Sequence, residues 1–282
     1  KVVDIMEKKI LLADCPDQKG LISKITNICY KHQLNIVNNT EFVDNTHNRF
    51  FMRTELEGIF NDETLLADLD SALPAESHRK LVSAGRKRIV ILVTKEAHCL
   101  GDILMKNYYG GLDVEIAAVV GNYDNLAELT EKFNVPYHTV SHVDISREEH
   151  EQRIIDTVSK YQPDYVILAK YMRILTPNFV AAFENKIINI HHSFLPAFIG
   201  AQPYKQAFER GVKIIGATAH YVTNNLDEGP IILQDVIHVD HKYSAEDMAR
   251  SGKDVEKSVL SKALRLVLEE RVFIYENRTV VF

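Results

Sequence analysis

The stretch Ile187-Ile188-Asn189-Ile190-His191-His192-Ser193-Phe194-Leu195-Pro196 decides the fold of the larger part of this chain. It begins as an apolar run typical of a buried strand and ends in polar residues before a proline-containing loop. In a strand, residues two apart project to the same face, so we expect Asn189 and His191 to point together and Ile190 to point into the core. Open α/β sheets bind ligands at the carboxyl ends of their strands, which favours a site here. Taken alone, the stretch also fits a hydrogen-bonded strand end before a turn.

Strand and helix patterns alternate on both sides of this stretch. The predicted strands before it are 89–93, 114–120 and 165–169, and the predicted helices are 99–108, 125–133, 147–160 and 177–183. After it, 213–221 and 231–239 are predicted as a strand pair and 244–268 as a long helix. This α/β alternation predicts a doubly wound, mostly parallel, Rossmann-like sheet.

The N-terminal part follows a different pattern. Its predicted order is strand, helix, strand, strand, helix, strand, at 9–13, 21–32, 34–43, 50–56, 61–71 and 77–82. This βαββαβ order is the ferredoxin-like arrangement. Near Ser83-Ala84-Gly85-Arg86-Lys87-Arg88 the residues become small and basic, which is typical of a linker. The sequence therefore predicts one domain over 1–84 and a second over 85–282.

The composition of the 282-residue chain excludes several classes of function. Its formal charge of −6 provides no field that would attract nucleic acid. Apolar runs such as 89–93 are far too short to span a membrane, and the charges spread through 1–12 argue against a signal peptide. Three cysteines without a Cys-x-x-Cys pair argue against a disulfide framework. We therefore expect a cytoplasmic protein with no nucleic-acid or membrane partner.

A second polar segment contains His220 and ends in Asp227-Glu228-Gly229-Pro230. The Gly-Pro turn would hold the Asp227 carboxylate in a fixed direction, although an aspartate before Gly-Pro is also common in ordinary turns. A carboxylate near His191 would stabilise its protonated form and could take protons from water. An amide such as that of Asn189 can donate to a developing oxyanion, and a histidine can transfer a proton.

Together these residues resemble the folate-dependent formyltransferase family. Its members carry Asn-x-His before a Ser-Leu-Leu-Pro-like loop, followed later by His-x-Val and Asp-x-Gly. The matching residues are Asn189 and His191, Ser193-Phe194-Leu195-Pro196, His220-Tyr221-Val222 and Asp227-Glu228-Gly229, within a resemblance that runs from about Arg88 to the end. It implies that Asn189, His191 and Asp227 are the catalytic residues.

The segment from Ala169 to Leu175 resembles the loop that holds folate through backbone groups in this family. The implied substrate contacts are Met172, Arg173, Ile174, Leu175, His220 and Gly229. Core packing of Met172 and Leu175, and a buried structural role for His220, are alternatives that the sequence leaves open. Gln202 stands where a basic residue is expected, which concerns affinity for the glutamate tail of folate.

The segment Lys95-Glu96-Ala97-His98-Cys99-Leu100-Gly101-Asp102 distinguishes branches of the family. Where the acceptor is glycinamide ribonucleotide, the corresponding loop is glycine-rich and binds phosphate. Here Glu96 and Asp102 would repel phosphate, and the segment resembles the hydrolytic branch. That resemblance implies hydrolysis of 10-formyltetrahydrofolate to formate and tetrahydrofolate, with formate supplied for purine biosynthesis and one-carbon folate pools kept in balance. A formyltransferase with an unidentified acceptor is the alternative.

The stretch Cys15-Pro16-Asp17-Gln18-Lys19-Gly20-Leu21 resembles the opening of an ACT domain. ACT domains commonly bind small amino acids at interfaces between paired domains, which implies a homo-oligomer and an effector such as glycine or methionine. The candidate contacts are Asp14, Gly20, Asn35 and Asn38. The helix N-terminus near Gly20 would face the ligand carboxylate, and Asp14 or an asparagine would face its ammonium group. A domain used only for oligomerisation is the alternative.

A metal hydrolase is the main chemical rival, because the second domain is rich in histidine. His191 and His192 are adjacent on a predicted strand, so they would point to opposite faces, and no His-Glu-x-x-His motif occurs. We therefore expect no metal and no cofactor. A non-catalytic amino-acid sensor on an inactive enzyme fold is a weaker alternative, because all three proposed catalytic residues are present.

Overall fold

The computed structural model describes residues 6–197 and 203–282, and the chain forms two compact units. One unit contains Lys1–Gly85, Glu269–Arg271 and Phe282, and the other contains Arg86–Leu268 and Val272–Val281. Gln202 lies outside the described residues. Within the described ranges, none of the helices combines the length and the apolar character that a membrane span requires.

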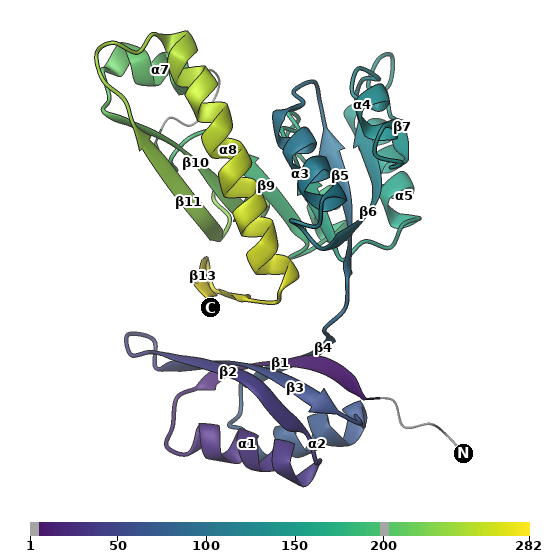
Figure 1. Cartoon of the computed structure of the whole chain (residues 1–282), viewed down its shortest axis with the longest axis vertical. Helices are drawn as coiled ribbons and strands as arrows, with labels where there is room; N and C mark the ends of the chain where they lie inside the picture. Colours follow the sequence, from purple (N-terminus) through teal and green to yellow (C-terminus); the bar gives the residue numbers. More distant parts are fainter. Residues whose placement is uncertain (1–5, 198–202) are drawn as a thin grey trace. The chain divides into compact units, whose positions relative to one another are not determined.

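The first unit is a four-stranded antiparallel sheet with both of its helices on one face (Figure 1). Its elements are β1 (Glu7–Pro16), α1 (Leu21–Lys31), β2 (Asn35–Asp44), β3 (Arg49–Gly58), α2 (Asp62–Ala72) and β4 (His78–Ser83). The spatial order β2-β3-β1-β4 confirms the predicted βαββαβ arrangement. The apolar stripe of α1, which includes Ile25 and Cys29, is buried against the sheet. α2 begins at Asp62 because the Asn61 side chain accepts a hydrogen bond from the backbone N–H of Thr64.

The second unit is built on a seven-stranded sheet with the order β11-β10-β9-β8-β5-β6-β7. The strands from β9 to β7 pair in parallel, whereas β10 is antiparallel to both β9 and β11. This confirms the predicted doubly wound, mostly parallel sheet. The elements are β5 (Lys87–Val93), α3 (His98–Tyr108), β6 (Val114–Gly121), α4 (Ala127–Glu131), β7 (Tyr137–Thr139), α5 (Arg147–Ser159), β8 (Tyr165–Leu168), α6 (Pro177–Ala182), β9 (Ile187–His191), α7 (Pro203–Arg210), β10 (Ile214–Tyr221), β11 (Ile231–His238), α8 (Ala245–Leu268), β12 (Val272–Tyr275) and β13 (Arg278–Val281).

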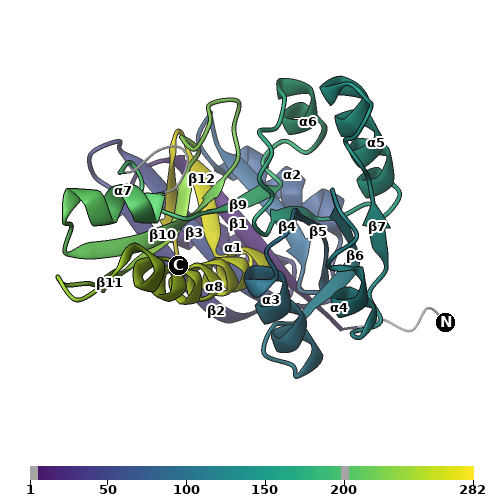
Figure 2. The same ribbon diagram turned by 90° about the horizontal axis from the view of Figure 1, so that it is seen from above.

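Helices cover both faces of this sheet, as Figure 2 shows from above. The side chains of the central strand β5 alternate between two cores. Ile89 and Ile91 pack with residues of α3 and α8, whereas Val90 and Leu92 pack with residues of α5 and α6. Since both faces are buried, β5 is a continuous apolar run, which is why its strand was predicted from a short stretch.

Several elements were not predicted from the sequence. These are β7, α7 and the hairpin of β12 and β13, which are all shorter than the stretch over which a period identifies an element. The helix predicted at 125–133 is confined to Ala127–Glu131. Asn134 has a φ of 57°, in the left-handed region, so the chain turns away directly after this segment.

Candidate active site

Two neighbouring strands bring three of the predicted polar side chains together. β9 and β10 are antiparallel, and their register places Asn189 opposite His220. Side chains directly opposite one another share a face of the sheet. Asn189 Nδ2 accordingly lies 3.2 Å from His220 Nε2. His191 follows Asn189 by one strand repeat, and Ile190 between them contributes to the core that contains α8.

The ring of His220 has fixed hydrogen-bonding roles. Its Nδ1 lies 2.9 Å from the carbonyl oxygen of Tyr221, and since a carbonyl only accepts, Nδ1 carries the proton. In the neutral ring, Nε2 then accepts a hydrogen bond from the Asn189 amide. Burial lowers the pKa of His220, which favours this neutral form. His220 is a buried residue, and its contact with Asn189 also orients the amide.

Asp227 reaches the same place from the loop after β10. Its Oδ1 lies 3.4 Å from Nδ1 of His191 and 3.7 Å from Nε2 of His220. Burial alone would raise the pKa of Asp227, but the hydrogen bond and the charge of His191 outweigh this effect and lower the pKa below its usual value. Asp227 is therefore ionised at neutral pH while it faces an imidazole.

The two ring nitrogens of His191 have different surroundings. Nδ1 faces Asp227, whereas Nε2 is buried and has no hydrogen-bond partner among the described residues. Buried polar atoms in proteins nearly always have a partner, so an unpaired one indicates a place for a ligand or water. An imidazole with a carboxylate at one nitrogen and an open position at the other can exchange a proton with a bound molecule.

Gly229 shapes the loop that carries Asp227. A Cβ atom at this position would lie 1.8 Å from the carbonyl oxygen of Tyr221, so only glycine lets the turn pack against the end of β10. Asp227 itself has a φ of 56°, in the left-handed region. Gly229 is not part of the cavity wall described next, and its observed contribution is to this turn.

A cavity of about 460 Å³ opens beside these polar residues. Its volume lies in the range of small-molecule sites. Asn189, His191, His220 and Asp227 all line it, together with the loop after β8 and residues 222–226 after β10. All four predicted folate-loop residues belong to the lining: Met172, Arg173, Ile174 and Leu175.

The exposure of the loop after β8 bears on the alternative of core packing for Met172 and Leu175. Met172 and Ile174 are 57% and 58% exposed, so neither is a core residue, whereas Leu175 packs partly against the core that contains α5 and α6. Three hydrogen bonds fasten this loop: Met172 N to Thr94 Oγ1 at 2.9 Å, Ile174 O from Arg147 Nη2 at 2.5 Å, and Thr176 N to Glu151 Oε1 at 3.0 Å. Sequence reasoning missed the three anchoring side chains, because they are distant in the chain.

The four predicted effector residues do not meet within one copy of the chain. Asp14 accepts a hydrogen bond from Arg49 Nε at 2.8 Å and pairs across the sheet with Phe51 of β3. Asn35 pairs with Glu57 of β3, which lies roughly 20 Å along the strand from Phe51 at about 3.3 Å per residue. Gly20 caps the start of α1 with a φ of 88°. Asn38 lies exposed on the edge strand β2.

A group of possible metal ligands lies outside the cavity lining. Among the described residues, His98, Cys99 and Glu256 form the only set of three such side chains whose ligand atoms lie within 4.8 Å of one another. The ammonium group of Lys170 lies 3.1 Å from Glu256 and would repel a cation. Burial also raises the pKa of the Cys99 thiol, which opposes the thiolate form that binds metals.

Comparison with known proteins gives consistent results for both units. Residues 87–264 match the family model of formyl transferases, and residues 9–73 match that of ACT domains. The chain is 72% identical over 276 residues to the formyltetrahydrofolate deformylase of Escherichia coli (strain K12), which covers 98% of this chain and 99% of that protein. It is 67% identical to the formyltetrahydrofolate deformylase of Haemophilus influenzae, covering 98% and 100% of the two chains. The crystal structure of a formyltetrahydrofolate deformylase from Pseudomonas syringae superimposes with a TM-score of 0.93 at 38% identity, covering 100% of this chain and 96% of that chain.

Proposed function

The chain belongs to the formyltetrahydrofolate deformylase family, and from this premise we propose how its own residues carry out the hydrolysis. The enzyme is a hydrolase that converts 10-formyltetrahydrofolate to formate and tetrahydrofolate. In the proposed mechanism the reaction takes place in the cavity beside β9 and β10. The observation that carries this proposal is the pair of environments around His191, with the Asp227 carboxylate at Nδ1 and an unpartnered Nε2.

Water is the nucleophile in this mechanism. The ionised Asp227 orients the water and accepts a proton as its oxygen attacks the formyl carbon. A new C–O bond forms, and the formyl oxygen becomes an oxyanion. Asn189 and His191 donate hydrogen bonds to that oxygen, where the negative charge develops.

The tetrahedral intermediate then breaks its bond to the folate nitrogen. The nitrogen leaves with the electron pair of that bond, and it needs a proton because its anion is a poor leaving group. The His191–Asp227 pair supplies this proton, directly or through water. It is the proton that the pair took from the attacking water. Formic acid and tetrahydrofolate result, the acid releases its proton to water to give formate, and the pair returns to its starting protonation state.

The loops that line the cavity support a role in holding the folate. The loop after β8 is fastened by Thr94, Arg147 and Glu151, so its backbone is ordered before the substrate arrives. Preorganised polar groups cost less conformational entropy on binding. In this proposal the backbone from Met172 to Leu175 recognises the pterin, and Arg173 lies at the cavity wall near it.

The proposal includes the setting in which the enzyme acts. It works without a metal or other cofactor, since each step above uses a side chain of this chain or water. The formate that it releases supplies purine biosynthesis, and the ACT domain binds a small amino acid that regulates a homo-oligomeric enzyme. The three cysteines are buried and unpaired, which suits a cytoplasmic location.

Formate release in the absence of any formyl acceptor tests the hydrolysis. In oxygen-18 water, mass spectrometry of the product should find one labelled oxygen per formate after a single irreversible turnover, because the second oxygen comes from the substrate. Unlabelled formate would show that water is not the nucleophile.

A further inference from the structure

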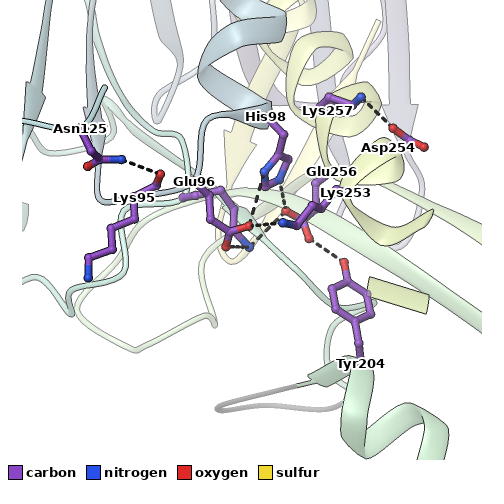
Figure 3. A network of polar contacts seen from close by, with 10 residues as sticks. Lys95, Glu96, His98, Asn125, Tyr204, Lys253, Asp254, Glu256 and Lys257 are labelled. Carbon is purple, nitrogen blue, oxygen red and sulfur yellow. Dashed lines mark hydrogen bonds and ion pairs between the residues drawn. The ribbon is translucent and has the colours of Figure 1, made fainter. Parts of the chain in front are cut away.

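A buried cluster of charged side chains lies next to the cavity, and the mechanism above makes no use of it. Its centre is Glu256 of α8, whose side chain is completely buried. The carboxylate accepts hydrogen bonds from His98 Nε2 at 2.7 Å and from Tyr204 Oη at 2.6 Å (Figure 3). Lys170 Nζ lies 3.1 Å from the same carboxylate. Glu96 lies at the outer side of the cluster, within 3.0 Å of Lys253.

Each carboxylate of the cluster has a lysine partner, Lys170 for Glu256 and Lys253 for Glu96. Burial opposes the ionised form of Glu256, but the His98 hydrogen bond and the Lys170 charge outweigh it and lower the pKa of Glu256 to about 2. A Cβ atom on Gly252, one turn earlier in α8, would lie 2.2 Å from the Tyr204 ring. The glycine therefore leaves the space through which Tyr204 reaches Glu256.

Lys170 links this cluster to the cavity. It directly precedes the loop that lines the cavity, it is itself part of the lining, and it is 4% exposed. Its φ of 64° is in the left-handed region, which costs energy for a residue with a Cβ and is offset by contacts elsewhere. The ion pair with Glu256 is one such contact.

His192 connects the cluster to the proposed reaction. The prediction that His191 and His192 point to opposite faces is wrong, because β9 ends at His191 and strand alternation does not extend to His192. The ring of His192 stacks on that of His191, with 5.1 Å between the ring centroids, and its centroid lies 6.3 Å from that of Tyr204. Burial, Lys170 and His191 lower the pKa of His192 to about 4, while Glu256 and Glu96 act in the opposite direction. The ring next to His191 is therefore neutral at neutral pH.

We propose that the Lys170–Glu256 ion pair is a positioning unit that holds the cavity wall beside His192 and His191 in the arrangement that hydrolysis needs. The inference rests on the proposed role of His191. Without Lys170, the start of the folate-facing loop loses its restraint, and His192 gains a proton more readily. A cation at His192 would disfavour the protonated form of His191 that delivers the proton to the leaving nitrogen.

The first test compares three variants. Lys170→Met keeps the length of the side chain but leaves Glu256 buried without its ammonium partner, so we expect kcat to fall at least about tenfold with KM within about threefold. The double variant Lys170→Met/Glu256→Gln contains no unpaired buried charge and should have a higher kcat than Lys170→Met. Lys253→Met is the matched control, because Lys253 is half-exposed and pairs with Glu96 rather than with Glu256, and it should retain wild-type kcat.

The second test uses the pH dependence of kcat. The acidic limb of the profile should move to higher pH in Lys170→Met, because removing the lysine charge raises the pKa of His192. The shift should disappear in Lys170→Met/His192→Phe, which retains an aromatic ring but has no group to titrate. A merely structural role would lower the melting temperature without moving this limb.

Two results would overturn the proposal: a wild-type kcat in Lys170→Met, or a loss of kcat without recovery in the double variant and without a shifted acidic limb. The wild-type enzyme is assayed in parallel. If it releases formate while either of these results is obtained, only the positioning role fails. If the wild type releases no formate, the proposed function itself fails.

Discussion

Asn189 and His220 face one another across β9 and β10, with 3.2 Å between the amide nitrogen and Nε2 of the imidazole. Because Nδ1 of His220 is committed to the Tyr221 carbonyl, the ring presents an acceptor to the amide. The amide is thereby held with its nitrogen in a defined direction, and its second hydrogen is free to meet an oxyanion.

Replacing Asn189 by alanine should slow turnover far more than it weakens binding. Loss of one oxyanion donor typically costs about 10²–10³ in kcat, roughly 2.7–4 kcal/mol. Steady-state kinetics would measure the change, with Asn125→Ala as a control, since Asn125 donates to the Lys95 carbonyl and does not line the cavity. A near wild-type kcat in Asn189→Ala would remove this residue from the mechanism.

His191→Ala and Asp227→Asn should each be severely impaired, and the double variant should be little worse than the worse single one. The two side chains lie 3.4 Å apart and act as one proton-transferring unit, and such units give non-additive losses. Asp254→Asn, which alters an exposed ion pair with Lys257, should keep wild-type kcat. Fully additive losses in the double variant would indicate that His191 and Asp227 act independently.

The value of kcat/KM should rise and then fall with pH, because the mechanism requires an ionised carboxylate and, later, a protonated donor. Since the pKa of Asp227 is held below its usual 3.8, acidification should protonate it only below that value. The same depression contributes stability that is present above the unfolded pKa and lost as the pH falls through the folded one. The melting-temperature difference between wild type and Asp227→Asn should therefore shrink as the pH falls through and below 3.8. A constant difference would contradict the lowered pKa.

Gly229→Ala should lower both the melting temperature and kcat. Its Cβ atom would lie 1.8 Å from the Tyr221 carbonyl oxygen, so the turn that carries Asp227 must move. Gly101→Ala is the matched control, because Gly101 is in α3 and a Cβ atom there meets nothing within 4 Å. Alanine at an open helical position stabilises by about 0.5–1 kcal/mol, so this variant should melt at a slightly higher temperature. Equal effects of the two substitutions would contradict the role of the turn.

A small amino acid should bind the full-length enzyme and change its rate of formate release, with glycine and methionine as the first candidates. Isothermal titration calorimetry and the formate assay would be run on the same preparation. Because Asp14 of β1 and Asn35 of β2 pair with distant residues of β3, we expect Asp14→Asn and Asn35→Ala to alter binding unequally. If no amino acid at millimolar concentration changes either measurement, the ACT domain serves only assembly.

The sequence predicted most of the architecture, because both domains have clear apolar periods. It also predicted Asn189, His191 and Asp227 as site residues, since these side chains stand at a strand end and before a Gly-Pro turn, and the structure places all three at one cavity. Lys170 and Glu256 could not be predicted, because their meeting depends on the course of α8 over the sheet. A glutamate on a helix normally reads as a solvent-facing residue, and nothing local distinguishes Glu256 from Glu246. The α7 helix that carries Tyr204 is only eight residues long, which is too short to be predicted with certainty from its pattern.

The position of α8 near the C-terminal end has a consequence for how the protein is made. The ribosome completes β9, β10 and the Asp227 loop before it begins the helix that buries Ile190 and supplies Glu256. A nascent chain at that stage lacks one wall of its core, so we expect a truncation after Ser244 to release no formate. We therefore expect that a partly synthesised chain does not consume the cell's formyl-folate.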